Sequence, residues 1–350
     1  MNMRVLKRLR RGKLLHRFHT RFVLLVAVAI IAVGVGAGLA LAKTGGTPIG
    51  TGVVVIDTNL GYENGEAAGT GMVLTSSGEI LTNNHVIRGA TTIKVVLPGT
   101  GHTYTAKVVG YDAVADVAVL QVNGAANLKT VSIGNSSTVK VGEAVTATGN
   151  AEGTGKLTTT SGKVTGVAKA ITVSDDEGGS ESLSNLIEMN SLLEPGDSGG
   201  PLENAAGQVI GMDTAASVSD VRFQQSASSD GYAIPIRTAV AIAAQIEAGT
   251  ASTAIHIGTT AFLGVDVASN GYGGSGALVA GVVSGGPAAG AGLVAGDVIT
   301  SVDGHTVATP TALGTLLATD KAGDQVSIAY VDTSGASNTT TVTLGSGPPQ

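Results

Sequence analysis

Short apolar runs separated by turns fill most of the chain after residue 50. Residues 53–56, 69–74 and 93–97 have the composition of strands, and residues 76–78 and 98–99 supply Gly-containing or Pro-containing turns between them. The chain holds 52 glycines and only 3% aromatic residues, which suits short strands better than long helices. It has no cysteine, so its stability must come from packing rather than from disulfides. The sequence therefore predicts a mostly β protein, and 350 residues suffice for two or three domains.

The N-terminal region has a different composition. Residues 1–21 carry eight Lys or Arg and no acid, and residues 22–42 carry no charge at all. A helix of that length would reach about 31 Å at ~1.5 Å per residue, which is close to the thickness of a bilayer core. The preceding basic residues predict a cytoplasmic N-terminus and an exported body. We expect a transmembrane anchor at 22–42, with a cleaved signal peptide as the alternative, because residues 40–42 form a small-x-small pattern.

The exported body is acidic. Of the 20 Lys and Arg in the chain, 12 lie beyond residue 21, where all 26 Asp and Glu are found. Nucleic-acid binding needs basic stripes and stacking aromatic residues, and the body has neither. We therefore expect no nucleic-acid partner.

A serine in a glycine-rich turn is the strongest candidate for chemistry. Ser198 lies in the stretch Glu-Pro-Gly-Asp-Ser-Gly-Gly-Pro-Leu at 194–202, and apolar strand-like residues follow it. Glycines on both sides let a substrate carbonyl approach the backbone closely, so the N–H groups of Gly196 and Ser198 could bind an oxyanion. A serine hydroxyl is a poor nucleophile alone and requires a base with an orienting acid.

Candidates for the base and the acid lie upstream. His85 follows the apolar run 80–82, and Asp116 precedes the apolar run 117–120, with Asp112 as the competing acid. The order His, Asp, Ser, at spacings of 31 and 82 residues, is the order used by chymotrypsin-like enzymes. The combination predicts a catalytic triad, whereas each motif alone would more often be structural.

Several stretches resemble one family. Residues 69–87 (GTGMVLTSSGEILTNNHVI), 111–122 (YDAVADVAVLQV), 187–202 (IEMNSLLEPGDSGGPL) and 231–236 (GYAIPI) are similar to HtrA-type (DegP-like) trypsin-fold serine proteases, and 262–265 (FLGV) with the C-terminal region resembles their PDZ domain. The resemblance implies two six-stranded antiparallel β-barrels of chymotrypsin type followed by a PDZ domain. It also implies a triad of His85, Asp116 and Ser198, and it favours Asp116 over Asp112.

The resemblance further implies an activity and its partners. We expect a serine endopeptidase of protein quality control that cleaves unfolded or misfolded polypeptides, or alternatively a chaperone or peptide-binding module with little turnover. Leu192 is expected at the base of the S1 pocket, and Thr214, Ala215 and Ala216 beside the substrate backbone. A trimer is an open possibility, although Tyr62 is the sole aromatic residue between 43 and 70. Position 197 is Asp where many relatives have Asn, so the partner of Asp197 is an open question.

The C-terminal region predicts a peptide-binding module. Leu263, Gly264 and Val265 are expected to bind a terminal carboxylate, and the strand that follows them to pair with an extended peptide. Thr309 and Pro310 predict the start of a helix that runs to about Thr319, and a second helix is expected at 238–247. Residues 345–350 are expected to form a frayed tail.

Neither a cofactor nor a metal is expected. The remaining histidines are scattered and lack partners at ligand spacing. The expected organisation is a basic N-terminus at 1–21, an anchor or signal peptide at 22–42, a linker at 43–50, a protease domain at 51–247 and a PDZ domain at 258–346.

Overall fold

The computed structural model describes residues 48, 50–62, 65–174, 180–214, 230–271 and 274–350. The predicted anchor at 22–42 lies outside these ranges. Within the described part of the chain, no helix is long and apolar enough to cross a membrane.

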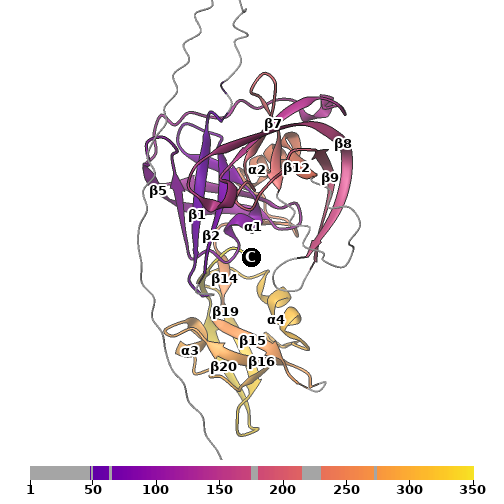
Figure 1. The fold of residues 1–350 in the computed structure, drawn as a ribbon. Helices are drawn as coiled ribbons and strands as arrows, with labels where there is room; N and C mark the ends of the chain where they lie inside the picture. Colours follow the sequence, from indigo (N-terminus) through magenta and orange to yellow (C-terminus); the bar gives the residue numbers. More distant parts are fainter. Residues whose placement is uncertain (1–47, 49, 63–64, 175–179, 215–229, 272–273) are drawn as a thin grey trace, which may run out of the picture. The chain divides into compact units, whose positions relative to one another are not determined.

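Residues 53–122 form the first barrel-like sheet, seen with the rest of the fold in Figure 1. Its strands are β1 (Val53–Leu60), β2 (Gly65–Val73), β3 (Glu79–Thr82), β4 (Thr92–Val96), β5 (Thr103–Asp112) and β6 (Val117–Val122), and the short helix α1 (Asn84–Ile87) follows β3. All neighbouring pairs are antiparallel, and β6 pairs with both β3 and β5. The six strands therefore return on themselves. The expectation of six strands needs one correction, because β13 (Ile255–Ile257) adds a seventh beside β5.

The second barrel is closed and six-stranded, as the resemblance to HtrA-type proteases implies. Its strands run in the order β10 (Pro201–Asn204), β11 (Val209–Thr214), β12 (Gly231–Pro235), β9 (Ser180–Met189), β8 (Thr158–Ser174) and β7 (Ala144–Gly149). Two 3-10 turns, η1 (Ser136–Thr138) and η2 (Ala151–Gly153), flank β7. The helix α2 (Ile236–Glu247) begins two residues earlier than predicted, directly after Pro235.

The strand β6 shows how the core joins the two barrels. Val117 and Val119 face one apolar cluster, and Ala118 and Leu120 face another, which agrees with the alternation of side chains along a strand. The first cluster contains residues of both barrels and of α2, and the second fills the first barrel. Because both faces of β6 are buried, the residue that precedes it, Asp116, has a fixed backbone position between the barrels.

The C-terminal domain has its own core. Its sheet has the order β15 (Val265–Ser269), β16 (Ala277–Val282), β17 (Val298–Val302), β19 (Gln325–Val331) and β20 (Ser337–Thr343), with β18 (His305–Thr306) on β17 and the short helix α3 (Pro287–Gly290) after β16. The helix α4 (Pro310–Leu317) packs against β15 and β16. The predicted cap is confirmed, since the Thr309 hydroxyl accepts a hydrogen bond from the Ala312 N–H at 3.1 Å.

The last residues differ from the expected frayed tail. Residues 345–347 form β21 (Gly345–Gly347), which pairs with β14 (Thr260–Phe262). Beyond β21, the Gln350 N–H donates to the Tyr111 hydroxyl at 3.3 Å, and the Asn84 side chain donates to the main-chain oxygen of Gln350 at 3.0 Å. Tyr62 stacks on Phe262, with ring centroids 5.0 Å apart. Composition alone could not reveal these contacts, because a Gly-Ser-Gly-Pro-Pro sequence is equally compatible with a solvated end.

Candidate active site

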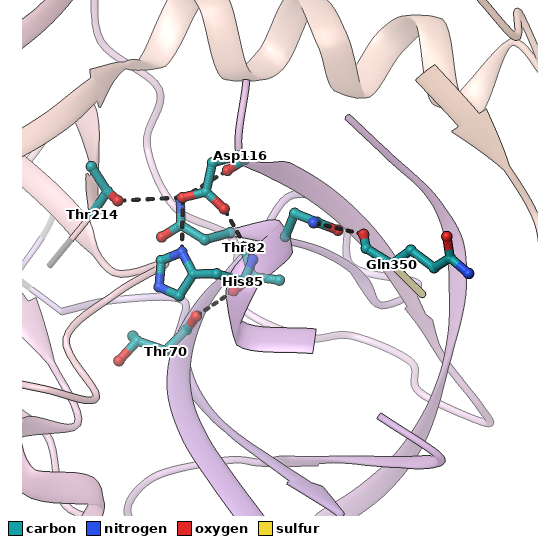
Figure 2. A network of polar contacts seen from close by, with 8 residues as sticks. Thr70, Thr82, His85, Asp116, Thr214 and Gln350 are labelled. Atoms are coloured by element: carbon teal, nitrogen blue, oxygen red, sulfur yellow. Dashed lines mark hydrogen bonds and ion pairs between the residues drawn. The ribbon is translucent and has the colours of Figure 1, made fainter. Parts of the chain in front are cut away.

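His85 and Asp116 form a hydrogen-bonded pair (Figure 2). The ring nitrogen Nδ1 of His85 lies 2.8 Å from Oδ2 of Asp116, and the backbone N–H of His85 donates to Oδ1 at 3.0 Å. The Thr214 hydroxyl donates to the same Oδ2 at 3.3 Å. The Asp116 side chain is 2% exposed, whereas that of His85 is 33% exposed. The carboxylate is therefore held in one orientation by three donors, while the imidazole remains accessible to a substrate.

The backbone around Asp116 is unusual. Asp116 has a φ of +55°, a left-handed conformation that costs energy for a residue with a side chain. The Asn83 side chain donates to the Asp116 carbonyl at 2.9 Å and helps to hold this conformation. Such strain persists only where the surroundings enforce it, and it is common at functional sites.

Asp112 has a different role from Asp116. Its Oδ1 accepts hydrogen bonds from the backbone N–H groups of Val114 and Ala115, at 3.0 and 2.9 Å. It therefore caps the turn between β5 and β6. The structure brings Asp116, rather than Asp112, to His85.

The turn that carries Ser198 is fixed by hydrogen bonds to most of its carbonyls. Within the turn, Asp197 N–H donates to the Glu194 carbonyl and Gly200 N–H donates to the Asp197 carbonyl, both at 3.0 Å. The carbonyl of Ser198 accepts from the Thr70 N–H of the first barrel at 2.9 Å. Ser198 is 5% exposed.

The glycines of this turn are required by its geometry. Gly196 has a φ of +99° and Gly199 a φ of +85°, both in the left-handed region. A Cβ at position 196 would collide with the carbonyl oxygen of Asn150, and one at 199 with the carbonyl oxygen of Thr70. The Gly-x-Ser-Gly pattern thus reflects close backbone packing as well as any need for access to a substrate.

The Asp197 side chain accepts a hydrogen bond from a backbone N–H of its own turn. Its Oδ2 accepts from the Glu194 N–H at 2.9 Å, and its Oδ1 has no hydrogen-bond partner among the described residues. Burial raises the pKa of Asp197 above its ordinary value. The question left open by the sequence is thus answered in part, since the observed partner is a backbone N–H.

A second buried acid lies near Asp197. Asp213 on β11 is fully buried, and neither of its carboxylate oxygens has a hydrogen-bond partner within the described ranges. Burial raises the pKa of Asp213 well above its ordinary value, and the negative charges of Asp197 and Glu203 raise it further. Glu203 accepts from the Gly50 N–H at 3.1 Å, and burial raises its pKa too.

The predicted substrate-contacting residues are only partly described. Leu192 is 55% exposed, directly before the Ser198 turn, so its side chain is accessible. Thr214 is buried, and its hydroxyl donates a hydrogen bond to Oδ2 of Asp116. Ala215 and Ala216 lie outside the described residues, as does most of the loop that follows them.

The predicted carboxylate-binding segment lies at the start of an edge strand. Leu263 is 3% exposed, and its carbonyl accepts from the Ala288 N–H at 2.9 Å. Gly264 has a φ of +78° and accepts from the Val283 N–H at 2.9 Å. Val265 opens β15, which pairs with β16 along only one of its edges. The other edge of β15 has no strand partner in the described part of the chain.

The sequence did not reveal Thr70 and Asp213 as residues of this site, nor the hydrogen bond that the predicted substrate-contacting residue Thr214 makes to Asp116. The Thr214 hydroxyl, the fully buried Thr70 and the buried Asp213 belong to strands that look like ordinary β sequence. An acidic residue directly after the apolar run at 209–212, Asp213 is a signal that the sequence does carry. Nothing in the sequence distinguishes Thr70 from other strand threonines. No group of three or more His, Cys, Asp or Glu side chains suited to a metal occurs within the described ranges.

Comparisons with known proteins agree with this architecture. Residues 69–212 match the family model of a trypsin-like peptidase domain, and residues 261–344 match that of a PDZ domain. The serine protease PepD of Mycobacterium tuberculosis is 35% identical over 305 residues, covering 84% of this chain and 63% of PepD. A DegP-like serine endoprotease of Pseudomonas savastanoi, whose name places it in the periplasm, is 34% identical over 294 residues, covering 81% of this chain and 57% of the relative.

The chain spans less than two thirds of the length of these curated relatives. Among solved structures, the HtrA-type protease AlgW with a tripeptide aligns over 86% of this chain and 96% of that one, at 28% identity and a TM-score of 0.48. From the family models and the curated relatives, the chain carries a trypsin-like peptidase domain followed by a PDZ domain, and it is a relative of the HtrA- and DegP-type serine proteases.

Proposed function

We propose that this protein is an exported serine endopeptidase that cleaves unfolded or misfolded polypeptides with a triad of Ser198, His85 and Asp116. The observation that carries the proposal is the His85–Asp116 pair, fixed by three donors on one carboxylate. The relationship to HtrA- and DegP-type proteases supports it. In this proposal, residues 51–247 form the protease domain and residues 258–346 the PDZ domain.

The proposed chemistry follows from the hydrogen bonds of His85. When its Nδ1–H donates to Asp116, the neutral imidazole has its basic nitrogen at Nε2. Nε2 takes the proton of the Ser198 hydroxyl as Oγ attacks the scissile carbonyl, and it returns that proton to the leaving amine. Asp116 stabilises the imidazolium that forms between these steps. The N–H groups of Gly196 and Ser198 bind the oxyanion of the tetrahedral intermediate.

The PDZ domain supplies a second binding site in this proposal. An extended peptide would pair with the unpartnered edge of β15, its terminal carboxylate near Leu263, Gly264 and Val265, and its last side chain against α4. Leu313 of α4 is buried in the core, whereas Leu316 and Leu317 are only partly buried and could line such a groove.

We also propose an extracytoplasmic location, in agreement with the periplasmic names of DegP-like relatives. Residues 22–42 would be a single-pass anchor with the catalytic domain outside the cytoplasm, or else a signal peptide whose removal releases a secreted enzyme. Assembly into a trimer belongs to the same proposal.

A casein turnover assay tests the proposal. The wild-type chain should release peptides from casein, and Ser198→Ala should reduce the rate by several powers of ten while the fold is retained. The alternative function is a chaperone or peptide-binding module with little turnover, which the open edge of β15 would also serve. Suppression of casein aggregation by both proteins, with no cleavage by either, would favour that alternative.

A further inference from the structure

Thr70 connects the first barrel to the turn that carries Ser198. It lies on β2, it is fully buried, and each of its polar atoms makes a hydrogen bond. Its N–H donates to the Ser198 carbonyl at 2.9 Å, and its carbonyl accepts from the Thr82 hydroxyl at 2.7 Å (Figure 2). Its own hydroxyl donates to the Gly196 carbonyl at 2.7 Å and accepts from the Asn150 N–H at 2.9 Å.

The Thr70 hydroxyl acts on a glycine of the turn, Gly196. Gly196 has a φ of +99° and lacks a Cβ, so its two peptide planes have more rotational freedom than those of other residues. In a planar trans peptide, the C=O and the following N–H point in opposite directions. The direction of the Gly196 N–H is therefore set by the position of the Pro195 carbonyl, which accepts from the Glu152 N–H at 2.7 Å.

The same hydroxyl controls both peptide planes. It binds the Gly196 carbonyl directly, which fixes the plane on the C-terminal side of Gly196. The same hydroxyl also accepts a hydrogen bond from the Asn150 N–H, which positions the segment 150–152. The Glu152 N–H of that segment donates to the Pro195 carbonyl and so fixes the peptide plane on the N-terminal side of Gly196. One buried hydroxyl thus joins the restraints on the two peptide planes that flank Gly196, one of which carries the Gly196 N–H.

We propose that Thr70 is a positioning residue for the oxyanion hole, and that its hydroxyl holds the Gly196 N–H toward the developing oxyanion. The proposal rests on the proposed function, because it takes Gly196 and Ser198 as the oxyanion donors. Thr70 does not touch the substrate and acts through Gly196. Its role requires a side chain that donates and accepts at once, which serine can also do and valine cannot.

Three variants of the full chain test this role. Thr70→Val keeps the shape and the backbone hydrogen bonds but leaves the Gly196 carbonyl and the Asn150 N–H without their partner. Thr70→Ser keeps the hydroxyl. The matched control is Thr58→Val, because Thr58 on β1 is 3% exposed and its hydroxyl donates to the Ala67 carbonyl at 3.1 Å, away from the turn.

The readouts are kcat, KM and the inhibition constant of a peptide aldehyde, which forms a tetrahedral adduct with the active serine. Loss of one oxyanion donor typically lowers kcat by about 10²–10³-fold, and a donor that is misaligned rather than removed should cost about 10–100-fold. We expect this loss of kcat in Thr70→Val with KM within about threefold of wild type, and an equal loss of affinity for the aldehyde. Thr70→Ser and Thr58→Val should both retain wild-type kcat within about threefold.

Two results would overturn the proposal. One is a Thr70→Val variant that loses only thermal stability, as Thr58→Val does, and keeps its kcat. The other is a loss of kcat without any loss of aldehyde affinity, which would place the effect outside the oxyanion hole. If Thr70→Val does not fold, Thr70→Cys decides, because a thiol is a weaker donor of similar size and should give an intermediate kcat. A wild-type kcat in Thr70→Cys would then refute the role.

Failure of the proposed function would look different. In that case either neither protein would cleave casein, or Ser198→Ala would cleave it as fast as the wild type, whichever residue is at position 70. A failure of the Thr70 proposal alone would leave the wild type active, Ser198→Ala inactive and Thr70→Val unaffected in kcat.

Discussion

Replacement of Asp213 by Asn should stabilise the protein at neutral pH. Asp213 is fully buried without a hydrogen-bond partner among the described residues, and its pKa is raised well above the ordinary value of 3.8 by burial and then by Asp197 and Glu203. Above pH 3.8 the unfolded chain therefore releases a proton that the folded protein keeps. Stability falls with rising pH until the folded-state pKa is reached, at a slope of up to about 1.4 kcal/mol per pH unit for one group.

Asparagine removes this dependence and adds an amide that can donate to a neighbouring carboxylate, such as Asp197 with its unpaired Oδ1. The free energy of unfolding should be measured by urea denaturation between pH 4 and pH 8, with Ser198→Ala as a shared background that prevents self-cleavage. We expect the advantage of Asp213→Asn to be small at pH 4 and to widen toward pH 8.

Asp266→Asn is a suitable control for that series, because it makes the same substitution at an exposed acid of the C-terminal domain. An Asp213→Asn variant that is less stable than its parent at pH 8 would contradict a protonated, destabilising Asp213. That result would mean that Asp213 is ionised in the folded protein and stabilised by a cationic group. An advantage of equal size at every pH would also contradict it, because a proton-linked cost must change with pH.

Three further predictions concern binding and topology. Cleavage-site profiling on an unfolded protein should show Val, Ala or Leu at P1. The residue at the expected base of the S1 pocket is Leu192, so no carboxylate lies there to pair with Arg or Lys. A dominant Arg or Lys at P1 would contradict this prediction. A peptide ending in Val should bind the full chain more tightly than its amidated form, because the Leu263–Val265 segment is proposed to bind the terminal carboxylate. Equal affinities of the two peptides in a titration would exclude that site. If residues 22–42 are an anchor, carbonate washing should not release the protein from membranes, and its basic N-terminus should be retained. N-terminal sequencing that finds a mature chain beginning at Lys43 would establish the cleaved form instead.

Much of the fold could be predicted from local sequence. The alternating short strands, the cap at Thr309 and the helical spacing of Val240, Ile242 and Ile246 depend on neighbours in the chain, and the structure contains each of them close to its expected place. The seventh strand of the first sheet could not be predicted, because β13 pairs with a strand more than 140 residues earlier. Register between distant strands depends on packing that local patterns do not encode.

The candidate site shows the same division. His85 and Ser198 are predicted by motif and order, and the resemblance to HtrA-type proteases favours Asp116 over Asp112. Thr70 and the Thr214 hydroxyl were missed because their importance comes from contacts across the barrels rather than from their own sequence surroundings. The partner of Asp197 was likewise invisible, because a backbone N–H three residues earlier leaves no distinct mark on composition.

The proposed function requires Ser198 to be a nucleophile activated by His85 and Asp116. Fluorophosphonates react with activated serines, so the full chain should be labelled with such a probe and the modified residue identified by peptide mass spectrometry. We expect a single modified serine, Ser198, and strong loss of its labelling in His85→Ala. The control is His102→Ala, which replaces an exposed histidine of the first barrel and should be labelled normally. Modification of a different serine, or undiminished labelling of Ser198 in His85→Ala, would contradict the claim.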